Sequence, residues 1–166
     1  KLMVLLGMTW LGNQHRRSLM LGEGFQTDKL IGNIATANSI TVSNNYEQYR
    51  YQALFTRVNY NWQNKYLLNL TARRDGSSRF GPEKQFAKFG SAGGSWVFSN
   101  EKFIQQKFSV LSFGKLRASY GTSGNDQIGN YQFYDSWTNT ARPYQDNLGL
   151  TPTRLFNSDY SWEETK

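Results

Sequence analysis

The chain has 166 residues, a formal net charge of +7 and 16% aromatic residues, while its whole hydrophobic set reaches only 38%. A disordered chain would lack those rings, the absence of cysteine excludes disulfide scaffolds and thiolate metal sites, and no apolar run approaches the roughly 20 residues of a membrane-spanning helix. The 19 Lys and Arg residues are scattered, which excludes a basic nucleic-acid-binding tail.

The amino-terminal part is expected to form one strand and a long loop. Lys1 to Trp10 is fairly apolar on both faces and strand-sized. Gly12 to Asn45 follows as a loop that carries a short helix at about residues 27–38. Because the chain starts at Lys1 and not at Met, we expect it to be processed or excised from something longer.

An alternation of apolar and polar residues then predicts a β-hairpin. From residue 54 to 62 the odd positions are mainly polar, and the even positions hold Leu54, Thr56, Val58, Tyr60 and Trp62. After the short turn Gln63-Asn64-Lys65 the same pattern continues with Tyr66, Leu68, Leu70 and Ala72. Each run has about 9–11 residues, the length of a tilted membrane strand.

Further strands are expected after a cluster of turn formers at Asp75 to Pro82. The third runs from Phe86 to Phe98, and a turn at Ser99 to Lys102 follows. The fourth runs from about Leu111 to Tyr120. Residues 121–160 show no clear strand pattern, and residues 161–166 look like the opening of another strand.

The connection lengths favour an outer-membrane β-barrel. They read long, short, longer, shorter and long, as expected for short periplasmic turns and long extracellular loops. Asp75 to Gln85 and Gly121 to Tyr160 are then the extracellular loops. Five or six strands are too few to close such a barrel, which begins at about eight. The backbone groups at open sheet edges find no hydrogen-bond partners in hydrocarbon, so we expect the chain to be part of a larger barrel.

The same alternation assigns the strand faces. The residues expected to contact lipid are Leu68, Leu70, Leu116 and Ala118, and those expected to face the lumen or a plug are Arg57, Asn69, Arg73, Lys115 and Arg117. The rings beside the short turns, which are Tyr60, Trp62, Tyr66, Trp96 and Phe98, fit an aromatic girdle at the membrane interface.

No motif points to catalysis, a metal or a cofactor. His15 is the single histidine and has no ligand partners at suitable spacing. The stretch Asp75-Gly-Ser-Ser lacks the spacing of a nucleophile elbow. Glu163 and Glu164 are adjacent and would point to opposite faces of a strand. We therefore expect no enzyme activity, no metal site and no cofactor.

Aromatic residues in the second long loop are the candidate contacts for a ligand or a partner. Tyr131, Trp137 and Tyr144 are the three proposed for that role. Other rings and arginines in the two loops expected to be extracellular are Phe80, Tyr134, Arg79, Arg142 and Arg154. The alternative is that these rings pack against loops of their own chain.

Four motifs, separated along the chain, carry a family resemblance. They are Tyr66-Leu-Leu with Arg73-Arg-Asp-Gly-Ser-Ser-Arg-Phe-Gly81, then Phe89 to Trp96 with Ser99-Asn-Glu101 and Phe103, then Lys115 to Gly121 with Gly124-Asn125, and last Asn157 with Trp162-Glu163 and Thr165. In this order they resemble the SusC/RagA-like family of TonB-dependent outer-membrane transporters. Gly90 and Ser158 stand where that family usually has proline.

The resemblance implies an all-β fold in which residues 1–166 form part of a transmembrane barrel of about 22 antiparallel strands. It implies a transporter in the cell outer membrane that imports glycans or peptides with energy from TonB. A SusD-like surface lipoprotein is the implied partner. The plug and the TonB-contacting part lie outside this segment.

Two other functions fit the composition. One is a secreted β-sandwich module whose exposed rings bind carbohydrate. The other is a basic β-rich domain that stacks its rings on single-stranded nucleic acid. The ordered motifs favour the transporter, so we expect outer-membrane lipid as a partner and no nucleic acid. The identity of the substrate stays open, because selectivity would depend on loops and a plug that lie mostly outside this segment.

Overall fold

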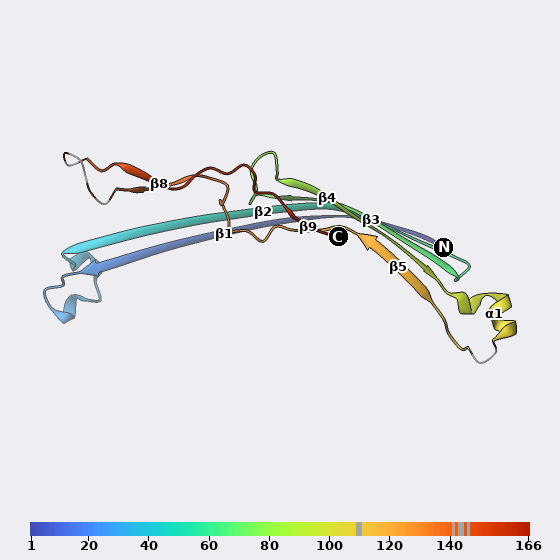
Figure 1. Ribbon diagram of the computed structural model, residues 1–166. Coiled ribbons are helices and arrows are strands. Elements are labelled where there is room, and N and C mark those ends of the chain that lie inside the picture. The colour runs from blue at the N-terminus through green and yellow to red at the C-terminus, as the bar shows by residue number, and fades with distance from the viewer. Residues whose placement is uncertain (109–110, 141, 143–144, 146) are drawn as a thin grey trace. The chain divides into compact units, whose positions relative to one another are not determined.

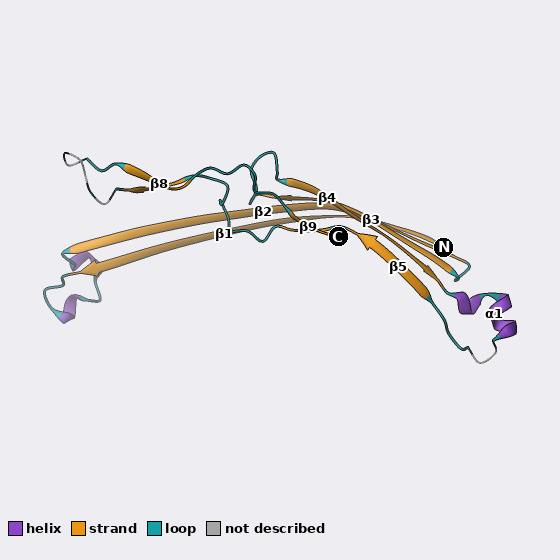
Figure 2. Ribbon diagram, viewed as in Figure 1, coloured by secondary structure: helices purple, strands orange, loops and turns teal. Residues whose placement is uncertain are grey.

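The computed structural model describes residues 1–108, 111–140, 142, 145 and 147–166, and most of its regular structure is β-strand (Figures 1 and 2). The strands are β1 (Leu2–Glu23), β2 (Ser39–Trp62), β3 (Tyr66–Ser77), β4 (Phe86–Trp96), β5 (Leu116–Gly121), β6 (Ser123–Asn125), β7 (Ser136–Asn139), β8 (Leu150–Arg154) and β9 (Glu163–Thr165). The helical turns are η1 (Asp28–Leu30), η2 (Ile34–Thr36), η3 (Phe98–Asn100) and α1 (Lys102–Lys107). The prediction of an all-β antiparallel fold is confirmed. None of the described helices is long and apolar enough to cross a membrane.

Five strands form the main sheet in the order β1-β2-β3-β4-β5. The pairs β2–β3, β3–β4 and β4–β5 are antiparallel. Two small sheets, β6–β9 and β7–β8, are built from the carboxy-terminal part of the chain. The chain divides into two compact units, one of residues 1–11 with 50–166 and one of residues 12–49. The candidate functional site lies in the first unit.

The strand register gives the main sheet two different faces. Leu70 pairs with Val58 and Ala92, and Leu68 pairs with Tyr60 and Gly94. Residues that pair directly on adjacent strands lie on the same face of the sheet. The register confirms that Leu68, Leu70, Leu116 and Ala118 share one face, which we call the apolar face. It also places Arg57, Asn69, Arg73 and Arg117 together on the other, polar face, while Lys115 precedes β5.

The turn between β2 and β3 has the geometry of a tight hairpin. Gln63 and Asn64 have φ values of 54° and 55°, and the Lys65 amide donates to the Trp62 carbonyl at 3.0 Å. Positive φ at both central residues is the type I′ pattern, whose twist matches that of the flanking strands. The predicted hairpin is therefore confirmed with its turn at the expected place.

The strands predicted for the amino-terminal part were too short. The expected loop at residues 12–45 is mostly strand, because β1 continues to Glu23 and β2 begins at Ser39. Only η1 and η2 stand in place of the expected helix at 27–38. Residues 12–18 are polar at odd and even positions alike, which hides this part of β1 from a pattern search, but backbone pairing between neighbouring strands needs no apolar side chains.

The connection lengths also differ from the expected alternation. Because β3 extends to Ser77, the β3–β4 connection is only residues 78–85. The β4–β5 connection, predicted to be short, spans residues 97–115 and contains η3 and α1. The fourth strand accordingly begins at Leu116 and not near 111. The alternation of lengths therefore cannot be used to assign the two ends of the sheet.

Candidate functional site

The carboxy-terminal end of β3 and the β3–β4 connection after it are folded inward and do not form a free loop. Asp75 and Ser77 are 5% and 2% exposed, and the Phe80 ring is completely buried. The Arg73 Nε donates to both Asp75 carboxylate oxygens, at 2.5 and 2.7 Å, and an Arg73 Nη donates to the Tyr51 hydroxyl. This pairing neutralises a carboxylate that would be costly to bury alone.

Asp126 joins this connection to the long segment after β5. The Ser77 hydroxyl donates to the Asp126 carboxylate at 2.7 Å. The Arg79 Nη1 donates to the Asp126 carbonyl at 2.9 Å and lies 3.7 Å from its carboxylate. The Arg79 Nε also donates to the Asn130 side chain at 3.2 Å. These charge-assisted bonds hold two segments together that are distant in sequence.

An aromatic cluster lies beside these polar contacts. Trp162 has its ring centroid 5.3 Å from Phe80 and 5.7 Å from Phe89, at tilted and edge-on angles that favour ring pairs. The Trp162 Nε1 donates to the Gln85 carbonyl at 3.1 Å. Phe80, Phe89 and Phe133 are all buried. The loop end of the sheet therefore has a small core of its own.

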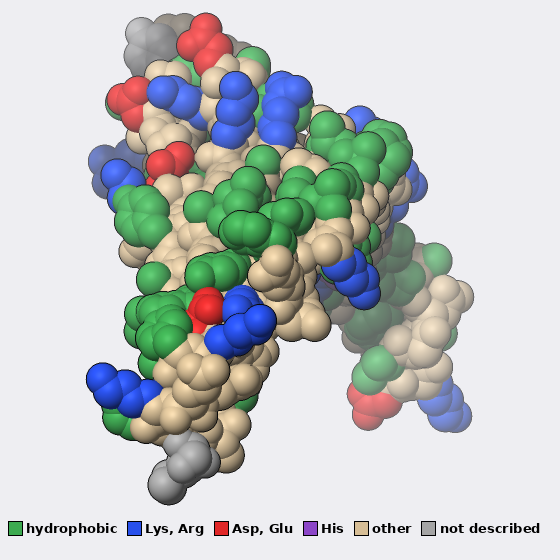
Figure 3. All heavy atoms as spheres, turned by 90° about the vertical axis from the view of Figure 1, so that its right-hand side faces the viewer, with side chains coloured by type: hydrophobic (Ala, Val, Ile, Leu, Met, Phe, Trp, Pro, Cys, Tyr) green, Lys and Arg blue, Asp and Glu red, His purple; other side chains and the backbone are tan. Residues whose placement is uncertain are grey.

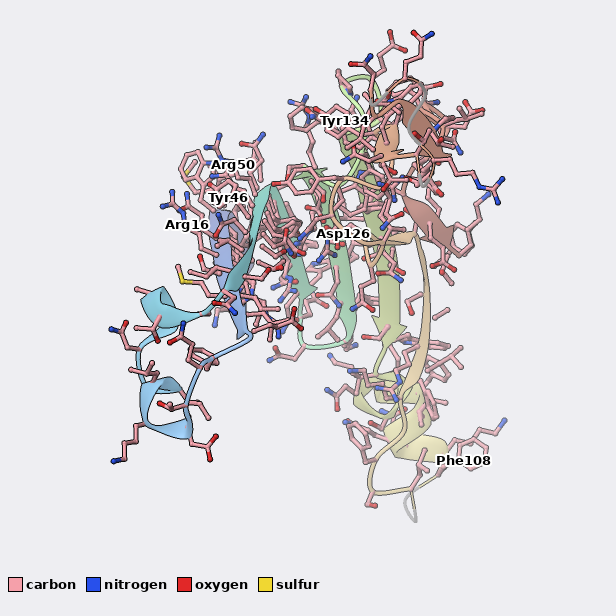
Figure 4. The ribbon with its side chains drawn as sticks, turned by 90° about the vertical axis from the view of Figure 1, so that its left-hand side faces the viewer. Arg16, Tyr46, Arg50, Phe108, Asp126 and Tyr134 are labelled. Carbon is pink, nitrogen blue, oxygen red and sulfur yellow. The ribbon has the colours of Figure 1, made fainter. Side chains whose placement is uncertain are left out.

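The sequence-predicted contact residues have different environments. Trp137 is 53% exposed, and its Nε1 donates to Asp135 at 2.7 Å. Tyr131 is half-buried and its ring lies 6.4 Å from that of Tyr134. Tyr144 lies outside the described residues. Figure 4 shows Tyr134 on this loop, at the opposite end of the unit from Phe108 in the β4–β5 connection.

Three of the other loop residues do not stand free for a partner, contrary to expectation. Phe80 is buried against Trp162, and Arg79 is engaged by Asp126 and Asn130. Arg154 donates to the carbonyls of Tyr134 and Tyr131 and to the Gln132 side chain, at 3.0, 3.3 and 2.6 Å. Guanidinium groups have five donors, so internal loop carbonyls compete well with an outside partner.

A second cluster closes the turn end of the sheet. The Glu101 carboxylate accepts from the Lys65 Nζ at 2.7 Å, from the Tyr66 hydroxyl at 2.9 Å and from the Trp96 Nε1 at 3.4 Å. The Lys65 ammonium and then the Tyr66 hydroxyl hold the pKa of this carboxyl below its usual range. Trp62 and Tyr66 are ring neighbours at 5.7 Å, as are Trp96 and Phe98 at 5.9 Å. The turn-flanking rings thus gather at one level, as a girdle requires.

The polar and aromatic clusters at the two ends of the sheet have a structural role. Within the part of the chain that the structure describes, no three His, Cys, Asp or Glu side chains are grouped to hold a metal ion. Asp75 is paired with Arg73, and Asp126 accepts from Ser77 and lies beside Arg79. The arrangement can present one apolar and one polar surface and can hold loops over the sheet.

No family model matches the chain. TonB-dependent receptor P39 of Formosa agariphila is 33% identical over 80% of the chain and 13% of its own length, and receptor P26 of that organism is 32% identical over 93% and 18%. TonB-dependent receptor SusC of Bacteroides thetaiotaomicron is 32% identical over 67% of the chain and 12% of its length. A structure of the RagAB peptide transporter superposes on 98% of the chain with a TM-score of 0.79 and 31% identity. The chain is a segment of a SusC/RagA-like TonB-dependent transporter.

The chain spans less than a fifth of the length of these relatives, with 18% of the RagAB chain covered. The names of the relatives are those of receptors and transporters and not of enzymes. This agrees with the absence of catalytic motifs from the sequence.

The structure explains which residues carry the SusC/RagA-like resemblance. The motif Arg73 to Gly81 supplies Arg73 with its partner Asp75, which is buried, and the buried Ser77 and Phe80. The motif ending in Thr165 supplies Trp162, which packs on Phe80. The sequence pattern does not single out Asp126, although it accepts from both Ser77 and Arg79. No local spacing could reveal it, because its partners belong to a distant turn.

Proposed function

We propose that this chain is a wall segment of an outer-membrane transporter that imports glycans or peptides. The observation that carries this proposal is the two-faced sheet, in which Leu68 and Leu70 alternate with Asn69 and Thr71 and pair with residues of the same kind. An outer-membrane barrel needs such strands, with an apolar face toward lipid and a polar face toward the lumen. On the apolar face, the side chains of Leu68 and Leu70 are 43% and 41% exposed.

Exposed apolar surface supports lipid as the environment of the apolar face. Leu54, Leu68, Leu70 and Leu116 of the apolar face are all exposed. On the side that Figure 3 draws, hydrophobic side chains gather in patches with Lys and Arg side chains around them. Soluble monomers rarely expose contiguous apolar patches of more than a few hundred Å². This observation disfavours the secreted carbohydrate-binding module. Outer-membrane lipid is therefore the proposed first partner.

Cysteine accessibility tests the assignment of the faces. Single Asn69→Cys and Leu70→Cys variants, made in a full-length protein from which any other cysteine has been replaced, compare adjacent residues; the segment itself contains no cysteine. We expect a membrane-impermeant maleimide to label Cys at 69 in intact outer membranes and to leave Cys at 70 unlabelled, because thiols in hydrocarbon do not ionise or meet the reagent. A lipid-soluble maleimide controls for reactivity. Equal labelling of both positions by the impermeant reagent would contradict the proposal.

We further infer a SusD-like lipoprotein as the partner on the loop side, and TonB as a partner of a part of the full-length transporter that lies outside this segment. The likeness to both SusC and the RagAB peptide transporter supports this partnership and leaves glycan and peptide as alternatives. The exposed ring of Trp137 is the contact residue that we propose within this segment. Tyr131 is a neighbouring contact, and Tyr144 keeps that role as a prediction.

Trp137→Ala tests the proposed contact. We expect the full-length variant to retain roughly tenfold less of the lipoprotein partner in a co-purification, because a buried interface Trp commonly contributes about 2 kcal/mol or more. Phe103→Ala is the matched control, since Phe103 is 58% exposed but belongs to α1 in the β4–β5 connection. Unchanged retention by the Trp137 variant would exclude this ring as a contact.

A further inference from the structure

We propose that the loop-end part of the apolar face binds a phosphate-bearing lipid of the outer leaflet through Arg74 and Lys88. This inference rests on the proposed function, which places the apolar face in the membrane and the surface lipoprotein at the loop end, and so puts the loop end at the outer leaflet. The site consists of two cations above an apolar hollow. The chemical class of the ligand is a phosphorylated glycolipid with several acyl chains, of the lipid A type.

The two cations are direct neighbours on adjacent strands. Arg74 of β3 pairs with Lys88 of β4, and both side chains are exposed. They lie on the same face as Leu70 and Ala72, since residues of a strand alternate between faces. Like charges directly opposite each other destabilise a sheet. A bound anion between them would remove that repulsion.

Among the described residues, no acidic side chain forms an ion pair with Arg74 or Lys88. Glu101, Asp75 and Asp126 pair instead with Lys65, Arg73 and Arg79. The Arg74 guanidinium lies over the Phe86 ring, 4.4 Å from its centroid. A cation–π contact orients the guanidinium but leaves its charge uncompensated. Arg74 is thus held in place, with hydrogen-bond donors for an oxygen-rich anion.

The surface next to the two cations is hollow and apolar. A cavity of about 290 Å³ has Leu6, Leu54 and Ala72 in its lining together with Arg74 and Lys88. The lining residues come from β1, β2, β3 and β4, and a small residue explains the hollow, because Ala72 pairs with Gly90 on this face and its methyl group leaves space beside Leu54. A lipid acyl chain could occupy this hollow while its headgroup reaches the cations.

The position of Arg74 and Lys88 along the membrane normal suits contact with a lipid headgroup. Between Tyr66 at the girdle and Arg74 the strand advances by roughly 26 Å at about 3.3 Å per residue. With a strand tilt of about 40° this corresponds to roughly 20 Å along the membrane normal, against an apolar band of about 25 Å. Gly76 is the next residue of β3 on the same face as Arg74, and it pairs with Gln52. The Trp10 Nε1 donates to the Gln52 side chain at 3.3 Å, so the Trp10 ring lies beside this level. Arg74 and Lys88 therefore lie near the outer boundary of the band.

Phosphate is the group that these side chains select best. A guanidinium presents a planar fork that matches phosphate oxygens, and an ammonium adds a compact point charge. A phosphate monoester carries about −1.5 to −2 charges near neutral pH, so it balances both cations. A neutral sugar headgroup would leave the repulsion between them unrelieved. The pair thus favours the phosphorylated lipid over its dephosphorylated form.

Native mass spectrometry of the full-length protein in detergent tests this site. Delipidated protein is titrated with lipid A and with lipid A from which phosphate has been removed. We expect wild type to bind the phosphorylated form roughly tenfold more tightly, and Arg74→Gln/Lys88→Gln to lose that preference. The matched control is Arg57→Gln/Arg117→Gln, which removes the same charge from the polar face and should keep the preference.

The other outcomes would overturn the inference. A preference that persists in the Arg74→Gln/Lys88→Gln variant, or that is absent from wild type, would exclude these cations as the site. Displacement of the bound lipid by inorganic phosphate would show a free-anion site in place of a lipid site. Labelling of the Asn69→Cys and Leu70→Cys proteins separates this inference from the proposed function, because correct facing with no lipid preference refutes only the lipid site.

Discussion

Leu70→Arg is expected to lower the unfolding free energy of the full-length barrel by about 2–4 kcal/mol. Leu70 lies in the middle of β3 between the girdle residue Tyr66 and the cationic Arg74. Its strand partners Val58 and Ala92 are apolar as well. At this depth a guanidinium cannot reach either interface without distorting the bilayer, so the cost approaches that of a charge at the midplane.

The adjacent Asn69→Arg variant is the matched control, because it adds the same side chain to the polar face. Urea unfolding in lipid vesicles, followed by the loss of heat-modifiable migration on gels, measures both proteins under one condition. We expect Asn69→Arg to change the unfolding free energy by less than about 1 kcal/mol. Equal destabilisation by the two substitutions would show that the assigned register is wrong.

Phe80→Ala is expected to destabilise the loop end by about 3–5 kcal/mol, the usual cost of truncating a buried Phe to Ala. Phe80 is the largest completely buried side chain among the described residues. Its removal leaves a cavity beside Trp162 and weakens the contact between the β3–β4 connection and the segment before β9. We expect residues 126–160 to become sensitive to protease while the strands stay folded.

Phe103→Ala serves as the control here also, because its ring is 58% exposed and makes no comparable contact at the loop end. Limited proteolysis of the full-length protein in outer-membrane vesicles, with the cut sites mapped by mass spectrometry, is the measurement. If Phe80→Ala shows the same cleavage pattern as wild type, the aromatic cluster does not hold the loop.

The residues that identify the family are mainly those that build this loop end. Arg73, Asp75, Ser77 and Phe80 are occupied by contacts within the chain. A resemblance carried by such residues indicates a shared fold and says little about the transported molecule. Substrate preference must therefore come from residues that are exposed, such as Trp137, and from the rest of the full-length protein.

The sequence by itself determined the strands from Leu54 to Ala72, the turn between them and the two faces of the sheet. These features are local, because successive side chains of a strand point to opposite faces and a turn is set by a few dihedral angles. The apolar members Val58 and Leu70 could therefore be grouped by position alone, and the register pairs them directly.

Only the tertiary structure decided how far β1 and β2 extend and which loop residues are buried. Residues 12–18 are polar at odd and even positions alike, so strand formation there depends on backbone pairing with a neighbour and leaves no periodic signal. Ile40 and Val42 do alternate with polar neighbours, but that run is too short to set the length of β2. Phe80, Asp126 and Trp162 meet from distant parts of the chain. A ring or carboxylate has the same appearance in the sequence whether it faces water or a partner, because burial depends on contacts between segments that local spacing does not encode.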